Sequence, residues 1–275
     1  MKLGLELDSL LSYLEYLHDK HDFNVLSISG GEPFLYKHLG EVLSAAKSMG
    51  YFNQMVSNGM LLKSKRNQEM LKYVDSIAIS IDGNRELHNE MRASEKAYDK
   101  MLEGIKVIKD HGVNFGLIHT LTKKSWPLIP ELHESALNNG ARLLQMHPIE
   151  NTGRASNALN DQFFLDEEDL HKIFILVSIL KANSPISIQL DLLHKQILSL
   201  NPGIVFGDIQ EVNRIQDLMK DLVITEQGKV LPISYGFSED FLIHNIHLNR
   251  GENSIEKFME TKGTRLKSLL NNTFQ

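Results

Sequence analysis

A chain of 275 residues is long enough for one large domain with ample core, and its 42% hydrophobic and 23% charged residues are ordinary for a soluble globular protein. The formal net charge of -6 argues against binding to nucleic acid or to an anionic membrane, which needs a basic surface. No apolar run approaches the roughly 20 residues of a membrane span, and the N-terminus lacks the pattern of a signal peptide. We therefore expect a cytoplasmic protein with neither a nucleic-acid partner nor a membrane partner.

The sequence contains no cysteine. Disulfides, thiolate catalysis and zinc–thiolate sites are thereby excluded, as are the thiolate ligands that iron–sulfur clusters normally require. Two histidine pairs remain as metal candidates, His18 with His21 and His244 with His247. We expect the first to be a solvated helix end and the second to lack a third ligand, so no metal site is predicted.

The chain begins with apolar residues at helical spacing, which predict an amphipathic helix over residues 1–22. From Asn24 onward, an apolar strand, a polar turn and a helix follow one another repeatedly. This alternation predicts a mostly parallel sheet, either open or curled into a barrel. The predicted strands are 25–29, 52–57, 76–81, 113–121, 141–149 and 186–190, and the predicted helices are 35–49, 65–73, 98–111, 130–139 and 164–183.

Polar residues stand where the predicted strands end. The carboxyl ends of parallel strands meet at one edge of a sheet or barrel, and ligand sites form there. Several polar turns in register are therefore better support for a ligand site than any one of them alone. The residues that we expect around this rim are Glu32, Ser57, Asn58, Ser80, Asp82, His119, Thr120, Gln145 and His147.

The charges on this rim suit an amino acid. The turns that form the rim contain no glycine-rich phosphate-binding motif. The carboxylate of Glu32, beside Gly30 and Gly31, would attract an ammonium group. Arg92 is able to form a bidentate ion pair with a carboxylate, and Asp82 is able to accept hydrogen bonds from hydroxyl groups. Each residue also has a plain structural interpretation: a capping acid for Glu32, a surface ion pair for Arg92 and a simple turn at Asp82.

Four short motifs carry a family resemblance: SGGEP at 29–33, SNG at 57–59, SIDG at 80–83 with HNEMR at 88–92, and PIENTGRA at 148–155. In this order and spacing they resemble the radical S-adenosylmethionine (radical SAM) superfamily, over roughly residues 5 to 200. The peptide-modifying and cofactor-maturing members are the most similar. The resemblance implies a partial (β/α)6 barrel that holds S-adenosylmethionine at the carboxyl ends of its strands, and a peptide or small protein as substrate.

The resemblance also implies a role for each rim residue. Gly30, Gly31 and Glu32 would bind the amino group of the methionine moiety, and Ser80 and Arg92 would bind its carboxylate. Asp82 would approach the ribose. The remaining residues of the expected cofactor site are Ser57 and Asn58 in the second turn, and Thr120, Gln145 and His147 along the adenine.

One family feature is missing from the sequence. Members carry C-x-x-x-C-x-x-C after their first strand, and those thiolates hold a [4Fe–4S] cluster. The sequence begins at the helix that follows this loop, so both the first strand and the loop are absent. We therefore expect the chain as written to lack the electron donor for radical chemistry, and to be a truncated or inactive form.

Two alternatives to a truncated or inactive form stay open. The first is a cluster-free pseudoenzyme that binds a peptide or a partner protein. The second is an ordinary barrel lyase or hydrolase with a metal or carboxylate pair on its rim. Loss of a first strand would also leave Val25–Ser29 as an exposed edge, which predicts self-association.

The C-terminal part is expected to be separate from the barrel, with a boundary after residue 200. Residues 221–224 and 230–233 predict a hairpin with Gly228 in its turn. This hairpin resembles the entry to the auxiliary-cluster domain of many relatives, which commonly have a cysteine at the position of Ile233. We expect residues 201–275 to be a degenerate form of that domain or a small packing appendage.

Overall fold

The computed structural model describes residues 5–149, 163–191, 218, 221–248 and 251–274. It contains two compact units. The first comprises residues 25–44 and 52–200, and the second comprises residues 1–24, 45–51 and 201–275. The predicted domain boundary after residue 200 stays a prediction. Among the described residues, no helix is both long and apolar enough to cross a membrane.

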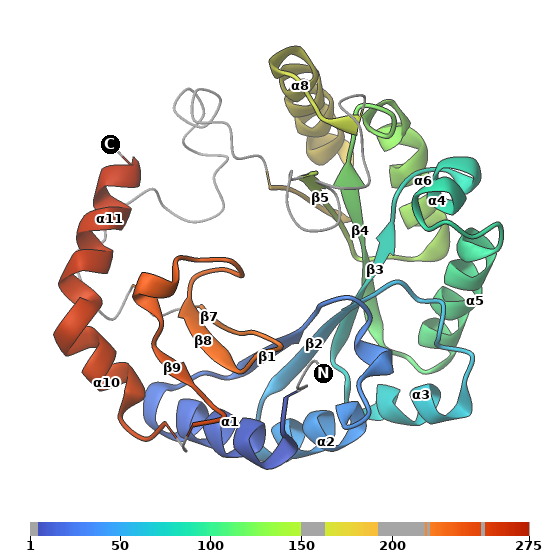
Figure 1. Cartoon of the computed structure of the whole chain (residues 1–275). Coiled ribbons are helices and arrows are strands. Elements are labelled where there is room, and N and C mark those ends of the chain that lie inside the picture. Colours follow the sequence, from blue (N-terminus) through green and yellow to red (C-terminus); the bar gives the residue numbers. More distant parts are fainter. Residues whose placement is uncertain (1–4, 150–162, 192–217, 219–220, 249–250, 275) are drawn as a thin grey trace. The chain divides into compact units, whose positions relative to one another are not determined.

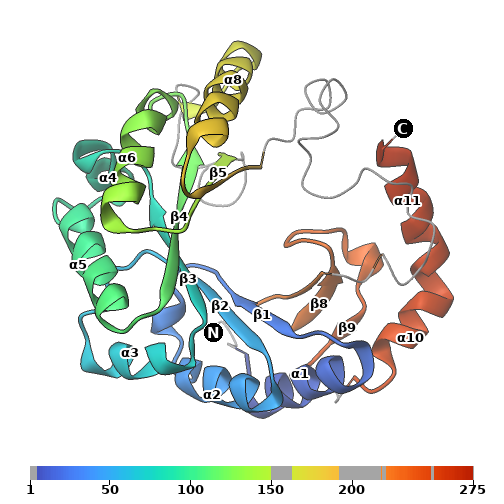
Figure 2. The same cartoon turned by 180° about the vertical axis from the view of Figure 1, so that it is seen from behind.

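The first unit is built on a parallel sheet whose six strands follow one another in chain order. Helices alternate with the strands and lie along one face of the sheet, as α3, α5, α6 and α8 do in Figures 1 and 2. The predicted parallel α/β fold is confirmed. The strands are β1 Val25–Ile28, β2 Phe52–Ser57, β3 Ser76–Ile81, β4 Asn114–Leu121, β5 Leu143–Pro148 and β6 Ser187–Leu190. The helices of this region are α2 Leu39–Met49, α3 Lys65–Met70, α4 Arg85–Met91, α5 Ala97–Asp110, α6 Ile129–Asn139 and α8 Glu167–Asn183.

Alternation along the strands separates an apolar face from a polar face. In β3, Ile77, Ile79 and Ile81 are all buried in the core that the helices cover. Ser76 and Ser80 point to the opposite face, because successive side chains of a strand alternate. Residues paired in register across parallel strands share a face, so the same polar face continues over the whole sheet. Its polar members are Ser27, Gln54, Ser76, Ser80, Asn114, Thr120, Gln145, His147, Ser187 and Gln189.

The helices differ from the sequence expectation at two places. The predicted helix from residue 35 is preceded by a short 3-10 turn, Pro33–Leu35, and α2 begins only at Leu39 because Tyr36 is extended. The helix α4 was not predicted. Its start is fixed by Asn84, whose side-chain oxygen accepts a hydrogen bond from the backbone N–H of Leu87 at 3.1 Å.

A close backbone contact fixes the turn after β2. Gly59 has a left-handed φ of 75°. Its carbonyl oxygen packs so closely on α5 that a Cβ atom at Gly104 would lie 2.2 Å from it. Only glycine fits at position 104, and this contact sets the place of the Asn58–Gly59 turn relative to the helix layer.

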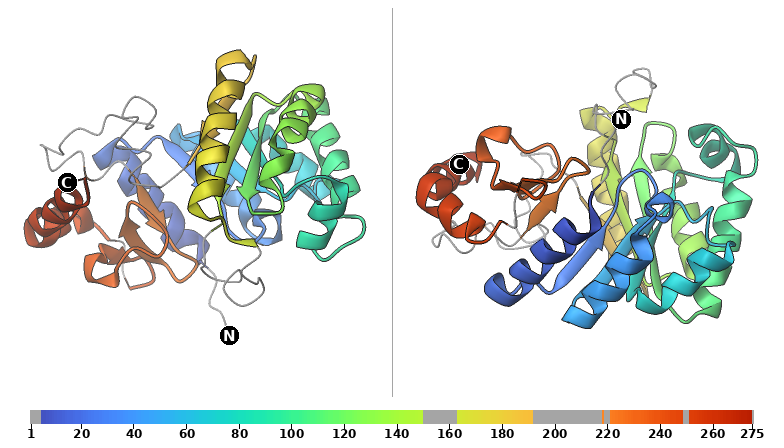
Figure 3. Two further views of the ribbon diagram at one scale, coloured as in Figure 1. Left: turned by 90° about the horizontal axis from the view of Figure 1, so that it is seen from above. Right: turned by 60° about the horizontal axis from the view of Figure 1, so that its bottom comes forward.

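The second unit combines the N-terminal helix with the C-terminal elements. The helix α1 spans Leu7–His21, and the antiparallel strands are β7 Leu222–Ile224, β8 Lys229–Pro232 and β9 His244–Asn245. The predicted C-terminal hairpin is therefore confirmed. A bent helical segment follows, made of α10 Ser254–Phe258, a π-helical stretch Met259–Gly263 and α11 Thr264–Phe274 (Figures 1 and 3).

Tyrosines of α1 tie it to α10. The hydroxyl of Tyr13 lies 3.0 Å from Ser254 Oγ, and the hydroxyl of Tyr16 donates to Glu256 Oε2 at 2.7 Å. Burial, together with the hydrogen bond to Glu256, raises the pKa of Tyr16 to about 12. The first helix of the sequence is thus anchored by residues about 240 positions later in the chain.

Candidate functional site

The carboxyl ends of the six parallel strands form one polar edge of the first unit. Glu32 follows β1, Ser57 and Asn58 stand at the end of β2, and Asp82 follows β3. Further along the sheet lie Thr120 at the end of β4 and Gln145 and His147 in β5. Glu150 to Ala155, the second part of the PIENTGRA motif, lies outside the described residues.

Glu32 joins the first two turns of this edge. Its Oε1 accepts hydrogen bonds from Ser57 Oγ at 2.9 Å and from the backbone N–H of Phe34 at 3.2 Å. Its Oε2 accepts from the backbone N–H of Asn58 at 2.9 Å. A carboxylate offers about four lone-pair positions, so three donors leave room for one more. The capping interpretation of Glu32 is therefore correct, and the residue keeps acceptor capacity for a ligand.

The two glycines before Glu32 leave open space at the backbone. Both Gly30 and Gly31 are exposed, and a Cβ atom added to either would meet no other atom within 4 Å. Gly30 has a φ of 136°, which residues with side chains rarely adopt. A ligand group is thus able to approach the backbone directly beside the Glu32 carboxylate.

Asp82 and Arg92 are bound to each other. The guanidinium donates from Nε to Oδ2 at 2.6 Å and from Nη2 to Oδ1 at 3.1 Å. Asp82 is 5% exposed, whereas the Arg92 side chain keeps 28% of its surface exposed. Burial alone would raise the pKa of Asp82, but the hydrogen bond with His88 and the charge of Arg92 outweigh it and hold that pKa below its usual value.

His88 completes this group from α4 and was not singled out from the sequence. It is fully buried, and its Nδ1 lies 3.1 Å from the backbone nitrogen of Asp82 and 3.3 Å from Asp82 Oδ2. Nδ1 accepts the hydrogen bond from the backbone N–H of Asp82. The HNEMR motif thus supplies two residues that meet the aspartate of SIDG.

His119 was predicted to lie on the rim, and this prediction is wrong. Its side chain is buried on the helix-covered face, where Nδ1 donates to the carbonyl of Ile81 at 2.7 Å. Nε2 is buried without a hydrogen-bond partner. Burial lowers the pKa of His119 to about 4, so the ring is neutral and links β3 to β4 as part of the core. Its place follows from alternation, since Ile118 and Thr120 occupy the polar face.

Polar side chains of β4, β5 and β6 gather at the far end of the edge, and the sequence predicted only some of them. Thr120 Oγ1 and His147 Nε2 are 3.4 Å apart. Gln145 Nε2 donates to Oδ2 of Asp191, which directly follows β6, at 2.7 Å. Gln189 and Asp191 were missed, although an aspartate after an alternating strand is the signal that had marked Asp82.

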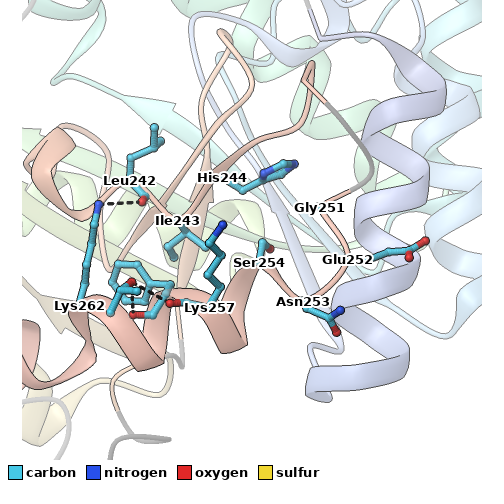
Figure 4. A pocket seen from close by; sticks show the side chains of 11 residues that line it. Leu242, Ile243, His244, Gly251, Glu252, Asn253, Ser254, Lys257 and Lys262 are labelled. Atoms are coloured by element: carbon cyan, nitrogen blue, oxygen red, sulfur yellow. Dashed lines mark hydrogen bonds between the residues drawn. The ribbon is translucent and has the colours of Figure 1, made fainter.

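The second unit has a pocket of about 350 Å³ beside α10, shown in Figure 4. Its polar lining includes His244, Ser254, Lys257 and Lys262. Lys262 Nζ donates to the carbonyl of Leu242 at 3.3 Å, and the His244 ring stacks on Tyr13. These contacts make the pocket part of the packing of α1, β9 and α10. Among the described residues, no group of three or more histidines and acids is placed to hold a metal ion.

A parallel sheet with helices on one face and polar side chains on the other, and with charged residues at its carboxyl edge, has the architecture of a partial α/β barrel. Residues 4–134 match the family model of the radical SAM superfamily. The match covers somewhat less than half of the 275 residues, and it confirms the predicted resemblance to this superfamily.

The chain is also similar to known proteins over part of its length. The chain is 26% identical over 144 residues to Fe-coproporphyrin III synthase of Methanosarcina barkeri, an alignment covering 52% of the chain and 36% of that protein. It is 30% identical over 169 residues to a probable GTP 3',8-cyclase of Saccharolobus islandicus, covering 59% of the chain and 54% of that protein. The chain thus spans between a third and somewhat over half of these relatives.

The fold is similar to that of native anSMEcpe with bound AdoMet and the Kp18Cys peptide. The TM-score is 0.69 at 15% identity, and the match covers 97% of this chain and 75% of that chain. At this identity the likeness concerns the fold. The neighbour binds the cofactor that the family name implies, together with a peptide.

The iron–sulfur cluster that the family implies has no fitting ligand set in this sequence. The 275 residues contain no cysteine, and the described residues offer no alternative group of histidines and acids.

Proposed function

We propose that the first unit binds S-adenosylmethionine at the carboxyl edge of its sheet. The Glu32 carboxylate receives the ammonium group of the methionine moiety, and Gly30 and Gly31 let that group approach. Arg92 and Ser80 receive the carboxylate. The observation that carries this proposal is the pair of opposite charges on one edge, each held in place by a neighbouring turn.

The hydrogen-bonding capacity of these residues supports a zwitterionic ligand. Glu32 has one acceptor position left after three donors, as described above. Arg92 uses two of its five N–H donors on Asp82. Among the described residues, no other hydrogen bond uses the remaining donors, and a guanidinium binds a carboxylate with two parallel hydrogen bonds.

The other predicted residues have supporting roles in this proposal. Ser57 and Asn58 orient Glu32, because both donate to its carboxylate. Asp82 orients Arg92, and its approach to the ribose would require a lone pair that Arg92 does not occupy. Thr120 and His147 lie further along the same face, where the adenosine moiety extends.

The substrate that we propose is a peptide or a small protein, as in the peptide-bound neighbour. The bound S-adenosylmethionine supplies a sulfonium centre, which in this family is the source of radical chemistry. Since the sequence holds no thiolate ligand, we propose that the chain alone binds the cofactor without cleaving it. A peptide-binding pseudoenzyme is the second candidate, and the same absence of cysteine favours it.

Isothermal titration of the purified chain with S-adenosylmethionine tests the proposal. We expect saturable heat from wild type and a clear loss of affinity in Glu32→Gln, because its amide carries no charge and can accept hydrogen bonds through only one of its two end atoms. Equal heats from the two proteins, or none from wild type, would reject the proposed site. Incubation followed by chromatography for 5′-deoxyadenosine tests the second statement, and any turnover by the chain alone would contradict it.

A further inference from the structure

A carboxylate bound by two glutamines closes the far end of the polar face. Gln145 and Gln189 are register partners on β5 and β6. Gln145 Nε2 donates to Asp191 Oδ2 at 2.7 Å, and Gln189 Nε2 donates to Asp191 Oδ1 at 2.8 Å. The backbone N–H of Asp191 donates to the carbonyl of Met146 at 2.8 Å. Backbone and side chain of Asp191 are therefore both fixed against the end of β5.

The free hydrogen-bonding positions of this group are mostly acceptors. Each glutamine turns its amide nitrogen toward Asp191, so its carbonyl oxygen is left without a partner among the described residues. The carboxylate has about four lone-pair positions and uses two. No lysine, arginine or histidine of the described residues forms an ion pair with Asp191. A half-buried negative charge with surplus acceptors and no cation favours a positively charged donor.

The group lies beyond the proposed methionine end of the cofactor. Ser80, Ile118, Gln145 and Gln189 form one continuous row across β3 to β6. Neighbouring strands are 4.7–4.9 Å apart, so Gln145 is about 10 Å and Gln189 about 14 Å from Ser80 along this row. The three side chains are thus on the ligand-facing side of the sheet but are separate from the residues that receive the zwitterion.

We propose that Gln145, Gln189 and Asp191 form a subsite for a cationic group of the substrate, an alkylammonium or guanidinium carried by a peptide. This inference rests on the proposed function, because the cationic group is taken to belong to the peptide substrate proposed there. The two glutamines hold the carboxylate in one orientation and offer their own carbonyl oxygens to the remaining N–H groups of the cation. Gln145, predicted to line the adenine, here faces the substrate side.

The test compares two small probes by saturation-transfer NMR and titration. Nα-acetyl-lysine N-methylamide carries the cation, and Nα-acetyl-norleucine N-methylamide has the same stem without it. We expect wild type to bind the lysine probe at least tenfold more tightly than the norleucine probe, in line with a charge-assisted hydrogen bond. Equal affinity for the two probes would overturn the proposal, and this comparison needs no variant.

Variants then locate the effect. Asp191→Asn is expected to remove the preference for the lysine probe and to leave the affinity for S-adenosylmethionine unchanged. Glu168→Gln on α8 is the control, because it changes the net charge equally at a side chain that is 78% exposed. A preference retained in Asp191→Asn, or lost equally in Glu168→Gln, contradicts the subsite.

The outcomes separate this inference from the proposed function. A wild type that prefers the lysine probe but does not bind S-adenosylmethionine would reject the cofactor site and leave the cation subsite standing. A tenfold loss of S-adenosylmethionine affinity in Asp191→Asn would instead assign the three residues to the nucleoside and overturn the substrate subsite. Thermal unfolding of each variant shows whether the ends of β5 and β6 stay folded.

Discussion

Arg92 binds Asp82 through both carboxylate oxygens, with Nε 2.6 Å from Oδ2 and Nη2 3.1 Å from Oδ1. The two partners are unequally buried, since only the arginine reaches solvent. Removing one partner of a buried pair is costly mainly because the other charge stays behind in a medium of low dielectric constant. Substitution of Asp82 and substitution of Arg92 should therefore lower the free energy of unfolding by different amounts.

We expect Arg92→Gln to destabilise the fold more than Asp82→Asn. The first leaves a buried carboxylate with only His88 beside it, and we expect a loss of about 3 kcal/mol in the free energy of unfolding. The second leaves a guanidinium that can turn toward water, at a cost of roughly 1–2 kcal/mol. Urea unfolding of both variants measures the difference. Equal losses would contradict the effect of unequal burial, and a larger loss in Asp82→Asn would show that the arginine is the more dependent partner.

Arg92→Lys separates charge from geometry at this pair. The lysine keeps a positive charge but cannot form two parallel hydrogen bonds. We expect it to restore part of the stability lost in Arg92→Gln, and to bind S-adenosylmethionine more weakly than wild type. Full recovery of both properties would show that only the charge matters.

Glu32→Ala should weaken the binding of S-adenosylmethionine by roughly 1.5–3 kcal/mol, the range for a hydrogen bond to a charged group. The substitution also releases Ser57 and Asn58, so the loss of the charge has to be distinguished from the loss of turn order. Titration calorimetry gives the affinity. Unchanged binding would remove Glu32 from the site.

Ser57→Ala is the matched control for Glu32. It removes one donor to the carboxylate and one acceptor for the backbone N–H of Gly59, but leaves the negative charge. We expect a loss in affinity of no more than about 1 kcal/mol, typical of one neutral hydrogen bond. A loss as large as that of Glu32→Ala would mean that turn order, and not charge, governs binding.

The strands and the rim were predictable because they depend on local pattern. The alternation of Ile77, Ile79 and Ile81 with serine and alanine is complete within six residues, and it assigns both faces of β3. The residues after each strand follow from the strand ends. The prediction that His119 lies on the rim was wrong. Alternation within β4 places its side chain on the helix-covered face, between Ile118 and Thr120, which lie on the polar face.

The pairings at the site were beyond sequence reasoning because they join separate elements. Asp82 meets Arg92 ten residues later, and Asp191 meets Gln145 across 46 residues. Local pattern indicates Asp82, Arg92 and Gln145 one by one, but it does not show which side chains bind each other. The short helix α4 was missed for a related reason: the turn signal of Asp82–Gly83 hides the cap at Asn84, which is visible only from its hydrogen bond to Leu87.

Gly104→Ala should destabilise the first unit and disturb the proposed site. The new methyl group would lie 2.2 Å from the carbonyl oxygen of Gly59, so the turn has to move. Overpacking of this kind typically costs about 1–3 kcal/mol. The turn also carries Asn58, which donates to Glu32, so the affinity for S-adenosylmethionine should fall as well. Urea unfolding and calorimetry measure the two effects.

Gly40→Ala is the control for a methyl group added to a helix. Gly40 lies in α2, where the atoms nearest to an added Cβ belong to the side chain of Met70, at an ordinary 3.5 Å. Alanine favours a helix over glycine by about 1 kcal/mol, so this variant should be as stable as wild type or more stable. A stable Gly104→Ala protein with unchanged binding would contradict the close contact between α5 and the turn.

His119 should make the fold less stable as the pH falls from about 6.5 to about 4. Burial holds the pKa of the native ring at about 4, below the ordinary value of 6.5, so the unfolded chain takes up the proton first. The contribution of the neutral ring is complete above pH 6.5, declines through this window and is level below pH 4. The shift corresponds to at most about 3 kcal/mol.

The comparison of wild type with His119→Asn isolates this effect, because the carboxylates titrate alike in both proteins. The asparagine side chain is able to donate to the carbonyl of Ile81 as Nδ1 does, but it takes up no proton. Urea unfolding at intervals between pH 7.5 and pH 4 should therefore show wild type losing stability more steeply than the variant. Parallel curves would mean that the native ring can be protonated where it lies, with Nε2 reaching water instead of being enclosed.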